Sequence, residues 1–196
     1  MISRDISSGV KFLMTKKYQL GKIIQKSFYK FTGEQIKSSP FGRIIIPEKY
    51  KPVNRGVSSH ILDDIIVPVS YYTKSTGDNV WDKLICAWLN SSIGILIRYN
   101  ARVILGSASE RLNGEQINQL NFPNIKEISD DDIENILKNF IIFISNSPLP
   151  TIKRQLTENY RKNLDEAFLN AFKYPKNLQK DLLDYIYTTI EYWANT

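Results

Sequence analysis

Basic and amide side chains gather in three turn-rich stretches of the sequence, residues 43–60, 71–79 and 98–113. Lys and Arg neutralise phosphates and release bound counterions, while Arg, Asn, Ser and His can hydrogen-bond to base edges. These residue types favour contact with a polyanion, and the net charge of +6 agrees with that. The candidate contact residues are Arg43, Lys49, Lys51, Asn54, Arg55, His60, Lys74, Arg98, Arg102, Ser107, Arg111 and Asn113.

Motifs for catalysis are absent from the sequence. It has no G-x-G for a dinucleotide or S-adenosylmethionine fold, no phosphate-binding loop and no Pro-Pro pair. Cys86 is the only cysteine and His60 the only histidine, so neither a Cys-based zinc site nor a Cys-His nucleophile is supported. We expect a chain that is not an enzyme, with no metal and no cofactor of its own.

Clustered carboxylates have simpler interpretations than catalysis. Asp63-Asp64 is typical of a turn or strand edge, and the run Asp130–Asp132 complements the dipole at a helix N-terminus. A metal-dependent nuclease using Asp63 and Asp64 remains an alternative, although no E-x-K or D-x-K triplet accompanies them.

The polar side chains of residues 43–60 must be positioned by short β-branched strands and by the basic loop between them. Residues 41–47 (FGRIIIP) predict a strand, and residues 60–72 predict one strand or two short ones broken at Pro68. Between them, residues 48–59 are almost free of large aliphatic side chains and predict an exposed loop. Residues 101–105 predict a further strand, followed by a turn.

Helical periodicity dominates elsewhere. Residues 78–89 predict a helix with one apolar stripe, and Asn90-Ser91-Ser92 interrupts it before a second helix to about Tyr99. A helix begins at Ser129, and the last segment predicts a helical hairpin. We therefore expect an α+β fold with a mixed or antiparallel sheet and packed helices, divided into a domain over residues 1–147 and a C-terminal helical appendage over residues 148–196.

Residues 84–123 contain an apolar helix ending in Leu-Asn-Ser-Ser, a second apolar segment, a basic stretch and an exit at Leu112 to Pro123. This block resembles the C-terminal target-recognition region of gamma-class adenine-N6 DNA methyltransferases, as in type I and type IIG restriction-modification enzymes. Residues 42–47 resemble the strand that opens this region, and residues 161–175 (RKNLDEAFLNAFKYP) resemble its closing element.

The resemblance implies a specificity domain that reads duplex DNA while a methyltransferase catalytic subunit supplies the S-adenosylmethionine chemistry. The family's catalytic motifs are missing here, so a specificity subunit, a split-gene product and an excised domain all stay open. The alternative function is a regulatory module that binds a methyltransferase or nuclease through its final helices without reading DNA. No apolar run has the length of a signal peptide or membrane span, so we expect a cytoplasmic protein.

Overall fold

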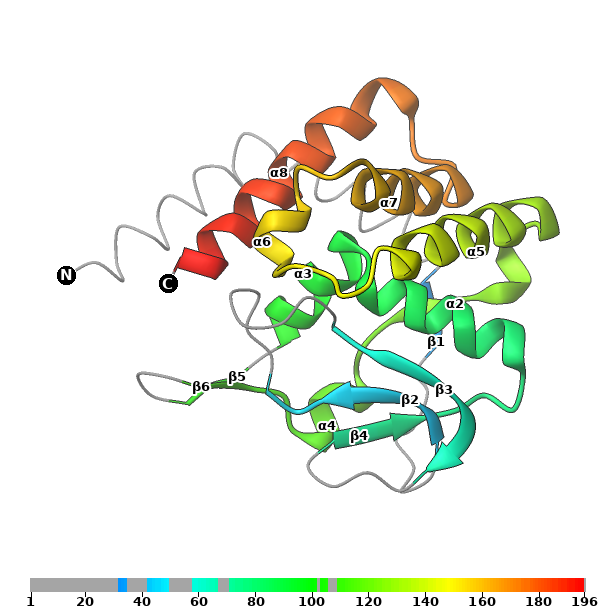
Figure 1. Ribbon diagram of the computed structural model, residues 1–196, viewed down its shortest axis with the longest axis vertical. Helices are drawn as coiled ribbons and strands as arrows, with labels where there is room; N and C mark the ends of the chain where they lie inside the picture. Colours follow the sequence, from blue (N-terminus) through cyan, green and yellow to red (C-terminus); the bar gives the residue numbers. More distant parts are fainter. Residues whose placement is uncertain are drawn as a thin grey trace.

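The computed structural model describes residues 32–34, 42–49, 58–66, 71–101, 103–105 and 109–195. Three layers are visible in Figure 1: a small sheet, the helices α2 and α3, and a helical layer made by α5, α7 and α8. The fold is α+β, as the sequence predicts, and the strand pairs in the described residues are antiparallel.

The main sheet has the strand order β3-β2-β4, with β2 (Gly42–Pro47) at its centre, β3 (His60–Ile66) and β4 (Tyr71–Lys74). These strands confirm the β-branched runs predicted from the sequence. Two further pairs join β1 (Thr32–Glu34) to β7 (Phe122–Pro123), and β5 (Val103–Leu105) to β6 (Ser109–Arg111).

The central helices meet at the interruption predicted from the sequence. Helix α2 (Asn79–Asn90) begins after Asp78, whose side chain accepts hydrogen bonds from the first-turn amides. Ser91 ends α2, and its hydroxyl accepts from the Gly94 amide at the start of α3 (Ser92–Ala101). A Cβ on Gly94 would lie 1.9 Å from the Trp88 carbonyl oxygen, so the tight approach of the two helices requires glycine.

The remaining helices form the outer layer. Helix α5 (Asp130–Ser145) is capped by Ser129 as predicted, and three aspartates occupy its first turn. The predicted C-terminal hairpin consists of α7 (Asn159–Ala171) and α8 (Lys176–Asn195), preceded by the separate short helix α6 (Ile152–Gln155). The sequence did not reveal α4 (Gly114–Asn118) or the 3-10 turn η1 (Ile125–Glu127).

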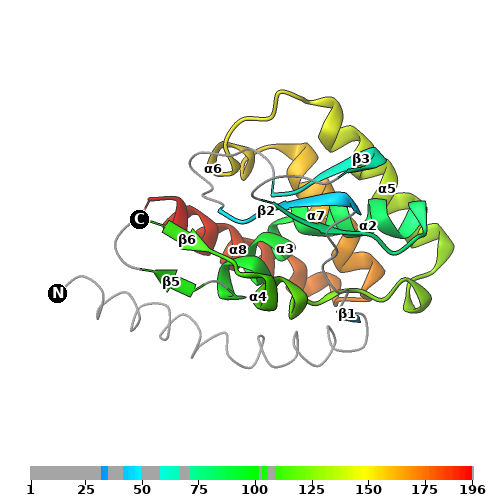
Figure 2. The same cartoon turned by 90° about the horizontal axis from the view of Figure 1, so that it is seen from below.

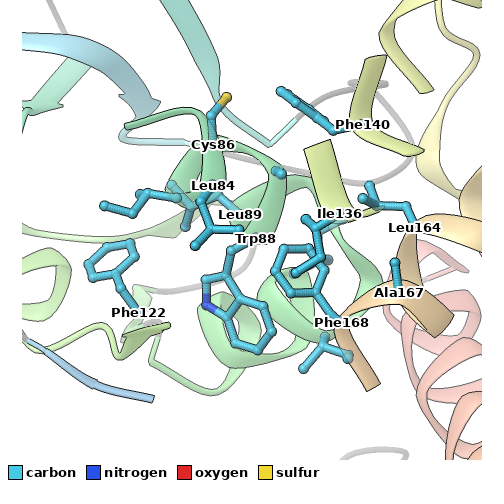
Figure 3. Packing of buried hydrophobic residues seen from close by; sticks show 14 of the residues in the cluster. Leu84, Cys86, Trp88, Leu89, Phe122, Ile136, Phe140, Leu164, Ala167 and Phe168 are labelled. Carbon is cyan, nitrogen blue, oxygen red and sulfur yellow. The ribbon is translucent and has the colours of Figure 1, made fainter. Parts of the chain in front are cut away.

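One hydrophobic core connects the two segments that were expected to divide at residue 147. Trp88 lies edge-on to Phe168 and Phe172, at ring-centroid distances of 5.1 and 5.4 Å, and Figure 3 shows it among residues of α2, α5 and α7. Fully burying side chains of this size contributes roughly 2 to 3 kcal/mol each. The C-terminal helices are therefore part of the main core.

In the described part of the chain, no single helix is long and apolar enough to cross a membrane. Only α2 and α3 taken together have that length and composition, and the two helices are bent by 74°.

Candidate nucleic-acid interface

The outer face of the main sheet presents two of the predicted contact residues. Ile44 and Ile46 of β2 are fully buried, so the alternation of side chains places Arg43 and Ile45 on the opposite face. His60, which is exposed, pairs directly with Ile45 across the β2–β3 ladder and therefore shares that face. We call this surface, formed by Arg43, Ile45 and His60, the outer sheet face.

The C-terminal end of β2 lies beside the β5–β6 hairpin. The backbone amide of Leu112 donates to the carbonyl of Glu48 at 3.1 Å, which joins the residue after β6 to the residue after β2. Lys49 follows and is exposed. Both views show the hairpin next to the end of β2 (Figure 1 and Figure 2). Glu48 of the first predicted stretch and Leu112 of the third are therefore neighbours in the fold.

Arg98 has a different place from the one predicted. Its side chain is only 3% exposed, and its guanidinium donates to the carbonyl oxygens of Pro47 and Ser58. A buried guanidinium occupied by two backbone carbonyls cannot reach a phosphate. In this structure Arg98 links the two ends of the predicted basic loop.

Lys74 also fails to reach the surface. It is fully buried at the end of β4, its ammonium lies 5.2 Å from the centroid of the Phe122 ring, and it has no hydrogen-bond partner among the described residues. Burial lowers the pKa of Lys74 to about 8. The strand register shows why Lys74 lies away from Lys49. Lys74 pairs with Ile44 near the start of β2, whereas Tyr71 pairs with Pro47 at the end of β2, where Lys49 follows.

Asn113 is exposed but has a local structural role. Its side chain accepts from the Gln116 amide at 2.9 Å while the Gln116 side chain accepts from the Asn113 amide at 2.8 Å, a capping box that starts α4. Arg111 ends β6, one residue before the bond to Glu48. Five predicted contact residues lie outside the described residues: Lys51, Asn54, Arg55, Arg102 and Ser107.

Asn90, in the Leu-Asn-Ser-Ser turn, makes a buried connection that no sequence pattern indicated. Its side-chain oxygen accepts from the Ser58 amide at 2.8 Å and the Ser59 amide at 3.4 Å. Its side-chain nitrogen donates to the Ser59 carbonyl at 3.0 Å and to the Cys86 carbonyl at 3.0 Å. The predicted helix stop is thus confirmed, and the same residue also holds the approach to β3.

The C-terminal hairpin reaches this turn through two buried side chains of opposite charge. Arg161 donates to the Asn90 carbonyl, and Asp165 accepts from the Ser92 amide at 2.7 Å and from the Tyr187 hydroxyl at 2.9 Å. Burial raises the pKa of Asp165, and the nearby Arg161 opposes that rise. Apart from Tyr187, these residues lie in two of the sequence blocks on which the resemblance rests, residues 84–123 and 161–175.

Charge is distributed unevenly along the sequence. Residues 1–57 contain 12 Lys and Arg against 3 Asp and Glu, a net charge of +9, while residues 58–196 contain 14 against 17, a net charge of −3. The positive excess therefore belongs to the part of the chain that supplies Arg43 and Lys49. A positive segment of this kind attracts polyanions more strongly than the rest of the sequence does.

Cys86 is buried beside Ser59 and Asn90, and burial raises its pKa to about 12, so its thiol is protonated at neutral pH. Among the residues that the structure describes, no group of three or more His, Cys, Asp or Glu side chains could hold a metal ion. Asp63 and Asp64 lie within β3.

Comparison with known proteins yields no relative: no family model, no curated protein and no solved structure matches this chain.

Proposed function

We propose that this chain is a sequence-specific recognition module for duplex DNA, without catalysis of its own, that serves a DNA adenine methyltransferase or restriction-modification system. The S-adenosylmethionine chemistry belongs to a catalytic subunit in this proposal. The observation that carries it is the Leu112–Glu48 backbone bond, which places the residue after Arg111 beside the residue before Lys49.

Residues of the right chemistry lie near that bond and on the adjoining sheet. Lys49 is exposed next to it, and Arg43 and His60 lie on the outer sheet face. A lysine can neutralise a phosphate, whereas Arg and His can also hydrogen-bond to base edges in the major groove. Arg98 and Lys74 do not belong to the proposed contact set because both are buried.

The contacts between resemblance blocks give independent support. Arg161 and Asp165 bind the Leu-Asn-Ser-Ser turn directly. Two sequence blocks that occur in order in the resembled family therefore form one structural unit here, which is what a shared recognition fold would require.

Selection from a randomised duplex pool tests the proposal. The purified chain is incubated with the pool at low and at physiological salt, and the bound fraction is sequenced. We expect enrichment of one short motif, because base-edge contacts distinguish sequences by about 1 to 3 kcal/mol per base pair. Salt-sensitive binding without enrichment would contradict sequence-specific reading.

A regulatory protein-interaction module is the second candidate, and a surface on α5 favours it. Ile141, Ile142 and Ile144 are 62%, 42% and 45% exposed, whereas the final helices proposed from the sequence bury most of their large apolar side chains. Neighbouring exposed apolar side chains can mark a contact surface for another protein. Absence of any DNA binding at low salt would make this the leading function.

A further inference from the structure

The two ends of the predicted basic loop are held by buried side chains from the α2–α3 junction. Arg98 of α3 donates to the Pro47 carbonyl, where β2 ends, and to the Ser58 carbonyl, just before β3 begins. A guanidinium suits this position because its planar fork carries several donors with fixed directions. One side chain thus bridges two points that are eleven residues apart in the sequence.

Asn90 of α2 fixes the second end more completely. Its amide group accepts from the Ser58 and Ser59 amides and donates to the Ser59 carbonyl, so it replaces the backbone partner that a neighbouring strand would supply. Asn90 is 2% exposed, and Ser58 and Ser59 are 0% and 2% exposed. Losing such a partner leaves buried polar groups unsatisfied, which is costly.

Two exposed candidate contact residues lie close to these fixed points. Lys49 is two residues after Pro47, and His60 is two residues after Ser58. Their backbone positions therefore depend on buried hydrogen bonds that do not touch the surface. Arg161 helps to hold Asn90 in place, because it donates a hydrogen bond to the Asn90 carbonyl.

We infer that Arg98 and Asn90 are positioning residues that determine sequence discrimination by the proposed interface without contacting DNA. This inference rests on the proposed function. Phosphate attraction depends weakly on small displacements, whereas a hydrogen bond to a base edge needs a well-defined distance and angle. Loosening the two fixed ends therefore reduces the preference for the target sequence more than it reduces general affinity for DNA.

The variant Arg98→Lys tests this inference at constant charge. Lysine keeps the positive charge but lacks the planar fork, and Arg154→Lys on the exposed side of α6 is the matched control. Thermal unfolding by circular dichroism first establishes that both variants fold. The first measurement uses no DNA: trypsin cleavage after Lys49 and Arg55 is followed by mass spectrometry.

Cleavage at these sites is expected to be about tenfold faster in Arg98→Lys, the factor that corresponds to loss of one charge-assisted hydrogen bond, and unchanged in Arg154→Lys. The second measurement compares affinity for the selected DNA motif with affinity for a scrambled duplex. The ratio is expected to fall about tenfold in Arg98→Lys. Affinity for the scrambled duplex is expected to change less than about twofold, since the charge is retained.

Equal losses on both duplexes, or unchanged trypsin cleavage, would overturn the inference. If trypsin cleavage rises but the wild-type chain binds no DNA, the proposed function fails and the discrimination role fails with it, while the anchoring of the two ends stands. If Arg98→Lys does not fold, hydrogen exchange of the wild-type chain tests whether the end of the loop at Ser58 and Ser59 is held. Slow exchange of the Ser58 and Ser59 amides supports the role of Asn90, and exchange as fast as in an unstructured peptide contradicts it.

Discussion

The helical layer of α5, α7 and α8 and the sheet of β2, β3 and β4 lie on opposite sides of the α2–α3 pair, and different interactions attach them (Figure 1). Apolar and aromatic contacts dominate on the helical side, where Phe140, Phe143 and Phe168 are buried. On the sheet side, Asn90 and Arg98 hold backbone groups at the strand ends through buried hydrogen bonds. Apolar contacts are non-directional, whereas these hydrogen bonds fix the positions of individual backbone atoms.

Arg161 of the helical layer binds Asn90, which in turn holds the start of β3, so its loss gives the largest expected effect. It is fully buried, donates to Asn90 and Gln155, and lies 4.6 Å from the centroid of the Phe143 ring. Arg161→Met removes the positive charge beside a buried carboxylate, and we expect a loss of about 3 to 5 kcal/mol in the free energy of unfolding. Urea unfolding measures it, with the exposed Lys162→Met as control. A loss below about 1 kcal/mol would show that the two regions do not depend on this guanidinium.

Gly94→Ala tests the close approach of α2 and α3 that both regions share. The new Cβ would meet the Trp88 carbonyl oxygen at 1.9 Å, so the backbone must move, and we expect a loss of about 2 to 3 kcal/mol. Gly77→Ala is the comparison: Gly77 has a φ of 84°, but its new Cβ would have no neighbour within 4 Å, so only backbone strain of about 1 kcal/mol applies. Equal thermal stability of the two variants would contradict the steric account.

Lys74→Met should stabilise the sheet side. Because burial lowers the pKa of Lys74 to about 8, the unfolded chain binds this proton more tightly than the folded chain between pH 8 and about 10.5. Stability of the wild type therefore rises with pH across that window. At pH 7 the variant is expected to gain up to about 3 kcal/mol, a gain that shrinks toward pH 10.5. Urea unfolding of both proteins from pH 7 to 10 tests this, and a constant difference would be the contrary result.

Asp132 gives the smallest expected effect, at the exposed edge of the helical side. Burial alone would raise its pKa, but hydrogen bonds from Lys173 and Ser129 lower it on balance. The charged form thus stabilises the fold above pH 4, and the contribution is lost as the pH falls through the folded-state pKa. Lys173 is 66% exposed, so Asp132→Asn should cost only about 0.5 kcal/mol at pH 7. A double-mutant cycle with Lys173→Met measures the pair, and coupling above about 1.5 kcal/mol would be inconsistent with solvent screening.

Local sequence patterns predicted the elements that local physics controls. The apolar stripe and Asp78 define α2, Ser129 and its aspartates define α5, and the β-branched run of residues 42–47 defines the central strand. The short elements α4 and β7 were missed because too few residues carry a periodic signal.

The candidate site was only partly predictable, because burial depends on distant partners. Composition correctly identified Lys49 and His60 as polar surface residues, but it also placed the buried residues Arg98 and Lys74 at the surface. Arg98 is buried by strand ends 40 and 51 residues earlier in the sequence, and Lys74 by Phe122. The role of Asn90 was missed for the same reason, since its partners Ser58 and Ser59 are not local.

The salt dependence of DNA binding tests the central claim most directly. The slope of log affinity against log salt is measured for the wild type, for Lys49→Ala, Lys51→Ala and Arg55→Ala combined, and for the exposed helix lysines Lys138→Ala, Lys176→Ala and Lys180→Ala combined. Both triple variants lose the same charge. Each phosphate contact contributes about 0.9 to the slope, so the first triple variant should lose up to about 2.7 and the second almost nothing. Equal slopes for the two variants, or no binding by the wild type at low salt, would contradict the proposed interface.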